Sequence, residues 1–152
     1  MKKIVTALTI LALSVLAACA GSKNVIKDFG SKLKVEGQMV KYVYWPNEEG
    51  ADDSVREVLD PKEEAAKKVI DSSAEYFNTL ETKEVKEKPV LPQTDVVVAY
   101  EIDTKDGSYN VSVYKQGYVK YQDFKNNKKK VLQISEADVK KAQDISVAYQ
   151  AK

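Results

Sequence analysis

Histidine is absent from this chain, and only one cysteine and one arginine are present. Without histidine the chain lacks the general base of the serine and cysteine hydrolase triads, and the commonest nitrogen ligand for zinc, copper and haem. A lone cysteine cannot form a disulfide within the chain, so packing alone must hold the folded part together. We therefore expect no catalytic residue, no metal site and no cofactor, and we expect that the protein is not an enzyme.

Long apolar runs are also scarce, and the one that exists lies at the N-terminus. Lys2 and Lys3 precede an apolar run from Ile4 to Leu16, which is interrupted only by threonine and serine. A transmembrane helix needs about 20 apolar residues, so this run is too short to span a bilayer comfortably. Residues 1–18 are therefore predicted to be a secretory signal peptide, with an uncleaved anchor or an ordinary secreted protein as the alternatives.

The apolar run stops at Leu16-Ala17-Ala18-Cys19, which resembles a bacterial lipobox at every position. The resemblance implies that the Cys19 thiol accepts a diacylglyceryl group and that the chain is cut before it. Palmitate-type acyl chains on Cys19 would then hold the protein on the extracytoplasmic face of the cell membrane, because each buried CH2 contributes about 0.8 kcal/mol. Lysine supplies nearly all the positive charge, which favours a Gram-positive host of low GC content.

No large excess of charge of either sign remains in the mature chain. Residues 1–18 carry two of the 24 basic residues and none of the 23 acidic ones, so their removal leaves a net charge of about −1. This balance gives no reason to expect nucleic acid as a partner. Residues 19–31 mix small and polar residues with isolated apolar ones and predict a lipidated tether, although Phe29 could already belong to the body. Residues 32–152 suit a single domain.

The body is predicted to be α+β, with an antiparallel sheet of about five to six strands and two helices on one face. Residues 32–45 alternate as a strand or hairpin would. Asp60, Pro61 and Glu63 predict a capped helix that runs to Leu80. A four-strand meander is predicted next, over residues 95–103, 108–116, 118–124 and 128–134. Asp106-Gly107 and two later turn signals separate these strands. Ser135 is expected to cap a closing helix.

The stretch from "SYNVSVYKQGYVKYQDF" to "VLQISEADVKKAQDI" resembles the C-terminal half of small uncharacterised lipoproteins of Gram-positive bacteria, the YhfM-like type. The resemblance covers roughly residues 55–147 and rests on structural motifs alone. It implies a fold of this kind and transfers no activity and no site residue.

Three features of the body are candidates for binding. The first is a group of four tyrosines, Tyr109, Tyr114, Tyr118 and Tyr121. These could stack on sugar rings, or half of them could face the core. One hairpin tip carries four lysines, Lys125, Lys128, Lys129 and Lys130. They could bind anionic lipid or an envelope polyanion, or they could simply keep the turn soluble. Trp45 is either a core anchor or an exposed contact. The expected partners are therefore the membrane, through lipid on Cys19, and an envelope polyanion or surface protein.

Three alternatives stay open. Paired carboxylates in a small envelope hydrolase need neither histidine nor cysteine. The acidic stretch with Glu48, Glu49, Asp52 and Asp53 could hold a calcium ion, although its spacing departs from the known loop and a solvated turn explains it as well. The cleaved leader, residues 11–18 above all, is similar in character to released signalling peptides.

Overall fold

The computed structural model describes residues 24–46 and 53–152. The predicted signal peptide, Cys19 and most of the predicted tether lie outside the described residues, as do Glu48, Glu49 and Asp52. In the part of the chain that is described, no helix is both long and apolar enough to cross a membrane.

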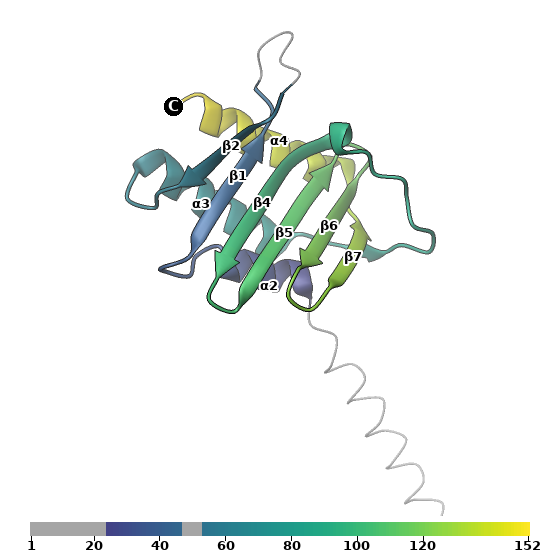
Figure 1. Ribbon diagram of the computed structural model, residues 1–152. Coiled ribbons are helices and arrows are strands. Elements are labelled where there is room, and N and C mark those ends of the chain that lie inside the picture. The colour runs from purple at the N-terminus through teal and green to yellow at the C-terminus, as the bar shows by residue number, and fades with distance from the viewer. Residues whose placement is uncertain (1–23, 47–52) are drawn as a thin grey trace, which may run out of the picture.

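The described residues form one antiparallel sheet of seven strands with its helices on one face (Figure 1). Across the sheet the strand order is β2-β1-β4-β5-β6-β7-β3. The strands are β1 (Met39–Tyr44), β2 (Val55–Leu59), β3 (Lys83–Glu84), β4 (Val96–Thr104), β5 (Gly107–Tyr114), β6 (Tyr118–Asp123) and β7 (Lys128–Gln133). The helices are α2 (Val25–Lys32), α3 (Glu64–Thr79) and α4 (Glu136–Gln150), with a 3-10 turn η1 (Gln93–Asp95). The predicted α+β class is confirmed, with more strands and one more helix than expected.

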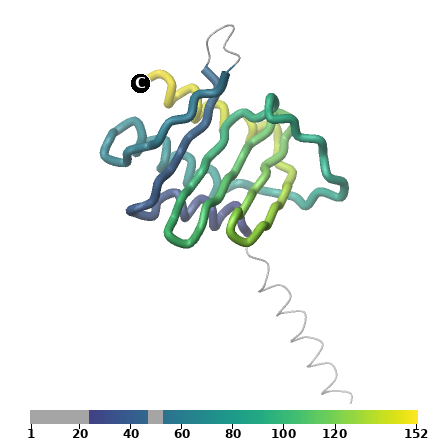
Figure 2. The backbone as a smooth tube through the Cα atoms, viewed as in Figure 1, coloured from purple at the N-terminus to yellow at the C-terminus, as the bar shows by residue number. Residues whose placement is uncertain are grey.

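The meander from β4 to β7 is confirmed, and its turns lie where the sequence places them (Figure 2). Gly117 has a φ of 85° and Asn127 a φ of 50°, the left-handed region that favours glycine and asparagine in tight turns. Along β5, Val111 and Val113 point toward the helices and are fully buried. Alternation along these strands therefore gives the sheet one apolar face against the helices and a second face that is mostly polar but carries a small apolar cluster.

The first strand differs from its prediction. It begins at Met39, and Tyr42 and Tyr44 face the helices, packing their rings against Tyr149 at centroid distances of 5.4 and 5.7 Å. Two short strands were missed: β2, which pairs with β1, and β3, which lies in the predicted surface linker 81–93 and pairs with Gln133 and Leu132. Both are edge strands, whose weak patterns carry little signal of their own.

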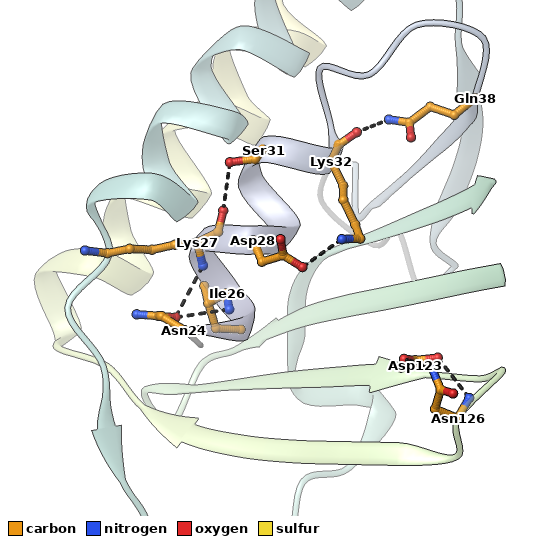
Figure 3. A network of polar contacts seen from close by, with 9 residues as sticks. All are labelled: Asn24, Ile26, Lys27, Asp28, Ser31, Lys32, Gln38, Asp123 and Asn126. Carbon is orange, nitrogen blue, oxygen red and sulfur yellow. Dashed lines mark hydrogen bonds and ion pairs between the residues drawn. The ribbon is translucent and has the colours of Figure 1, made fainter. Parts of the chain in front are cut away.

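The predicted tether is too long at its C-terminal end, because α2 belongs to the folded body. Ile26 and Phe29 are fully buried, and Leu33, just past the helix end, is 2% exposed. Asn24 caps the helix by accepting hydrogen bonds from the Ile26 and Lys27 amides (Figure 3). The folded domain therefore starts at or before Asn24, not at residue 32.

The other two helices follow the predicted stripes but differ at one cap. Helix α3 begins at Glu64, because Asp60 accepts from the Lys62 amide in a separate turn instead of capping the helix. Helix α4 begins as predicted, since the Ser135 hydroxyl accepts from the Asp138 amide at 3.1 Å. The predicted apolar stripes are buried on both helices: Ala66, Val69, Ile70, Ser73, Phe77 and Leu80, and Val139, Ala142, Ser146 and Tyr149.

Candidate binding face of the sheet

The helices α2, α3 and α4 all lie behind the sheet in Figure 1, which leaves its other face without a helical cover. We call this uncovered surface the open face. Because side chains alternate along a strand, the open face carries the residues that point away from the helices: Lys41, Val43, Arg56, Val58, Glu101, Asp103, Asn110, Ser112, Tyr114, Tyr118, Lys120, Gln122 and Lys129. Of these, Val43, Ser112 and Tyr114 are nevertheless buried by their neighbours. It divides into three regions of different chemistry.

The first region, on β2, β1 and β4, is a neutralised network of ion pairs. Arg56 contacts Glu101 at 3.0 Å, and Lys41 contacts Asp103 at 2.9 Å. Asp103 also accepts a hydrogen bond from the Ser108 hydroxyl at 2.6 Å. This bond and the Lys41 ammonium hold the pKa of Asp103 below its ordinary value. These charges bind one another, so they offer little to an outside ligand.

The second region, on β5, β6 and β7, carries positive charge without a partner. Lys120 and Lys129 form no ion pair with any described residue. The cross-strand register places Lys120 opposite Ser112, and Lys129 opposite Gln122, which in turn lies opposite Asn110. The Ser112 hydroxyl is buried and donates to the Asn110 side-chain oxygen at 3.0 Å. Two ammonium groups therefore share this region with the side-chain amides of Asn110 and Gln122, and ammonium and amide N–H groups are donors that bind anionic ligands.

The third region is aromatic and lies at the end of the same face. Tyr114 and Tyr118 are directly opposite each other on β5 and β6. Tyr114 is buried with Val43, Val96 and Ala99, and Trp45, Leu91 and Tyr118 pack half-buried against this cluster. Burial raises the pKa of Tyr114. Trp45 also lines a cavity of about 470 Å³ with Val96, Lys115 and Val147. Tyr118 and Trp45 therefore keep part of their rings exposed, and Tyr118 lies two residues from Lys120 on the same face of β6.

The predicted tyrosine cluster is divided between the two faces. Tyr121 is 7% exposed and lies on the helix-covered face, where its ring stacks on Tyr109 at 6.4 Å. Burial raises the pKa of Tyr121 to about 12. Tyr121 therefore belongs to the core rather than to a binding surface, and the interpretation in which half of these tyrosines face the core agrees with the structure.

The four lysines of the predicted tip are also separated. Lys129 points to the open face, and Lys130 to the opposite face, where it pairs with Glu84 at 3.0 Å. Lys125 and Lys128 are exposed at the turn itself. The sequence therefore predicted the positive charge but not its division among three surfaces.

The acidic side chains of the described residues form no metal-binding cluster, and none of those with a shifted pKa has it raised. No group of three or more histidine, cysteine, aspartate or glutamate side chains there could hold a metal ion. The carboxylates whose pKa departs from the ordinary value are all lowered, chiefly by hydrogen bonds: Glu57, Asp71, Asp103 and Asp123. None of these four supplies the raised carboxylic acid that hydrolysis by paired carboxylates uses.

Asn110, Ser112 and Gln122 are site residues that motif reasoning missed. They alternate with buried valine and tyrosine at a period of two, and this parity is the only signal in the sequence that could have found them. Polar residues at such positions usually indicate only a solvated face. Their interest here comes from the two unpaired lysines that the register brings beside them.

Comparisons with known proteins give little beyond the fold itself. No family model matches the chain. No curated protein matches it. A crystal structure described as "Putative Lipoprotein from Clostridium perfringens" is similar at 11% identity and a TM-score of 0.44, covering 80% of this chain and 93% of that one. A likeness at this level carries no inference about function, and the resemblance to YhfM-like lipoproteins stays a prediction.

Proposed function

We propose that this chain is a lipid-anchored, non-enzymatic domain on the extracytoplasmic face of a bacterial membrane, and that its open face binds an anionic polymer of the cell envelope. The lipobox-like sequence at Cys19 supports the location. The unpaired Lys120 and Lys129 beside the side-chain amides of Asn110 and Gln122 support the binding role, and this observation carries the proposal. The half-buried rings of Tyr118 and Trp45 would stack on sugar rings at the edge of the same surface.

The open face favours a polymer over a compact ligand. Its polar groups are spread over three neighbouring strands, which lie about 4.8 Å apart. An extended chain with repeated anionic groups can contact several strands at once, whereas a small molecule would reach few of these groups. Because Lys120 and Lys129 are single charges on long side chains, the interaction should depend strongly on ionic strength.

The test compares two double variants of the full chain that lose the same charge. Lys120→Gln with Lys129→Gln removes the unpaired lysines of the open face. Lys27→Gln with Lys68→Gln removes two exposed lysines of α2 and α3, which form no ion pair with described residues. Each exposed contact contributes up to about 1 kcal/mol, so the first pair should weaken binding to purified anionic wall polymer on the order of tenfold.

The control pair should change the affinity less than twofold. The affinity for the wall polymer should also fall as the sodium chloride concentration is raised. This fall should be steeper for the wild type than for the Lys120→Gln, Lys129→Gln variant. Equal loss in both variants would show that net charge, and not this face, drives association. Tight binding that salt does not weaken would point instead to a surface protein held through the aromatic region.

A further inference from the structure

The turn between β6 and β7 carries an aromatic ring that the core does not use. Phe124 is 60% exposed, although other aromatic residues of the described chain are largely buried. Its backbone is held in place, since its amide donates to the Ser108 carbonyl at 3.1 Å. The ring is therefore presented to solvent from a fixed position.

Two lysines flank the Phe124 ring, and the acidic residue of the same turn, Asp123, is buried. Lys125 and Lys128 are exposed, and neither lies within ion-pair distance of a described carboxylate. Asp123 is only 7% exposed and accepts hydrogen bonds from the Asn126 amide at 3.1 Å and its side-chain nitrogen at 2.8 Å (Figure 3). These bonds, and to a smaller extent the charge of Lys128 opposite it on β7, hold the pKa of Asp123 below its ordinary value. Its carboxylate faces inward and offsets part of the Lys128 charge, whereas Lys125 has no such partner. The outer surface of the turn is therefore cationic and aromatic.

A neighbouring turn supports this surface. The β-carbon of Lys125 lies 3.1 Å from the position that a β-carbon on Gly107 would take, so the turn after β6 rests against the turn between β4 and β5. The second turn carries Lys105 and Asp106, whose charges offset each other. The two adjacent turns thus form a platform whose excess charge comes from Lys125 and Lys128.

The predicted anchor keeps the platform close to a bilayer. Four residues lie between Cys19 and Asn24, so the two are at most about 18 Å apart along the chain. Helix α2, which Asn24 begins, and the turn after β6 both lie toward the lower edge of the molecule in Figure 1. A lipid-anchored domain on so short a segment has its α2 end facing the membrane.

We propose that the Phe124 turn docks on the anionic surface of the membrane, with the ring among the lipid headgroups and Lys125 and Lys128 against lipid phosphates. Aromatic side chains favour the membrane interface, and lysines near the surface of an anionic leaflet are attracted to it. The docking rests on the lipid anchor proposed above, but not on the open face. It gives the anchored domain a fixed orientation, in which the sheet edge at this turn faces the bilayer.

The test places a nitroxide label on the lipidated full-length protein in vesicles. Phe124→Cys carries the label at the turn, and Val58→Cys, a site that is 62% exposed on the open face, is the matched control. Vesicles contain either phosphatidylglycerol with phosphatidylcholine or phosphatidylcholine alone. In anionic vesicles the ratio of oxygen to nickel-chelate collisions should be severalfold higher at position 124 than at position 58, because oxygen concentrates in lipid.

Lys125→Gln with Lys128→Gln should return the ratio at position 124 toward the value found in neutral vesicles. The proposal is overturned if labels at 124 and 58 give equal ratios in anionic vesicles, or if the ratio at 124 is the same with neutral lipid and after loss of both lysines. The intact mass of the same sample reports the acyl chains on Cys19, so failure of the anchor is seen separately. The vesicles contain no wall polymer, so the result does not depend on open-face binding.

Discussion

At the scale of single residues, Glu57 joins parts of the fold that are far apart in sequence. Its carboxylate accepts hydrogen bonds from the hydroxyls of Tyr44 and Tyr149 and from the ammonium group of Lys152. Lys152 also lies 3.9 Å from the centre of the Tyr149 ring. The bond from Tyr149, above all, lowers the pKa of Glu57. One carboxylate on an edge strand therefore holds the end of α4 against the sheet.

Glu57→Gln should lower the free energy of unfolding by about 1.5 kcal/mol at pH 7, because hydrogen bonds to a charged acceptor become bonds to a neutral one. The folded pKa of Glu57 lies below its ordinary, unfolded value of 4.5, so its contribution is complete above that value and is lost as pH falls through the folded pKa. Urea unfolding at several pH values measures this difference.

The difference between wild type and Glu57→Gln should therefore shrink as the pH falls below 4.5. Glu75→Gln, on the exposed side of α3, is the control and should leave the midpoint within about 0.5 kcal/mol of wild type. A Glu57→Gln deficit that is constant from pH 7 to pH 3 would contradict the role of the charge.

At the scale of elements, α2 depends on a glycine inside a helix. A β-carbon at Gly30 would lie 3.0 Å from the Ala74 carbonyl oxygen and 3.0 Å from the β-carbon of Phe77. The missing side chain therefore lets α2 pack closely on α3, and Phe29 meets Phe77 edge to face at 5.4 Å. Helix propensity favours alanine over glycine by about 1 kcal/mol, so here packing outweighs propensity.

Gly30→Ala should lower the free energy of unfolding by about 1 to 2 kcal/mol, despite the gain in helix propensity, because the backbone oxygen of Ala74 cannot move aside freely. Ser31→Ala, the next and exposed position of the same helix, should be neutral or slightly stabilising. Chemical denaturation of both variants checks this. A more stable Gly30→Ala protein would show that α2 has room to move away from α3.

The same glycine explains why the sequence did not predict α2. Ile26, Phe29 and Leu33 follow helical spacing, but Gly30 and Ser31 weaken the pattern, and the helix has only 8 residues. The meander and α4 were predictable because turn residues and the Ser135 cap mark their ends locally. The open face was only partly predictable: parity separates Tyr118 from Tyr121, but the pairing of Lys41 with Asp103 and the isolation of Lys120 depend on contacts across strands.

At the scale of the whole molecule, the predicted anchor and the folded body are separate units in the sequence. The body starts at or before Asn24, and its core contains no cysteine among the described residues. Lipid on Cys19 would set the location of the domain without taking part in its packing. The sequence indicates this division, because the lipobox-like residues and the core residues do not overlap.

Cys19→Ser should abolish incorporation of labelled fatty acid and leave the domain folded. The wild-type protein should begin at Cys19 and carry a mass increment of at least two acyl chains, because a single chain binds membranes only weakly. Intact mass spectrometry of membrane fractions and circular dichroism of both proteins measure these two outcomes. A wild-type protein that retains residues 1–18 without lipid would contradict the anchor.

The shortness of β3 leaves part of the sheet margin unpaired, which matters if copies of the domain are anchored side by side on one membrane as proposed above. β3 pairs only with Leu132 and Gln133, so the outer backbone groups of β7 from Lys128 to Val131 have no strand partner among the described residues. A strand of another chain could pair with such a free margin, and Lys128 and Lys129 oppose this by electrostatic repulsion, whereas Lys130 is paired with Glu84. The charges of β7 would thus keep neighbouring copies from joining into a continuous sheet and preserve them as individual molecules.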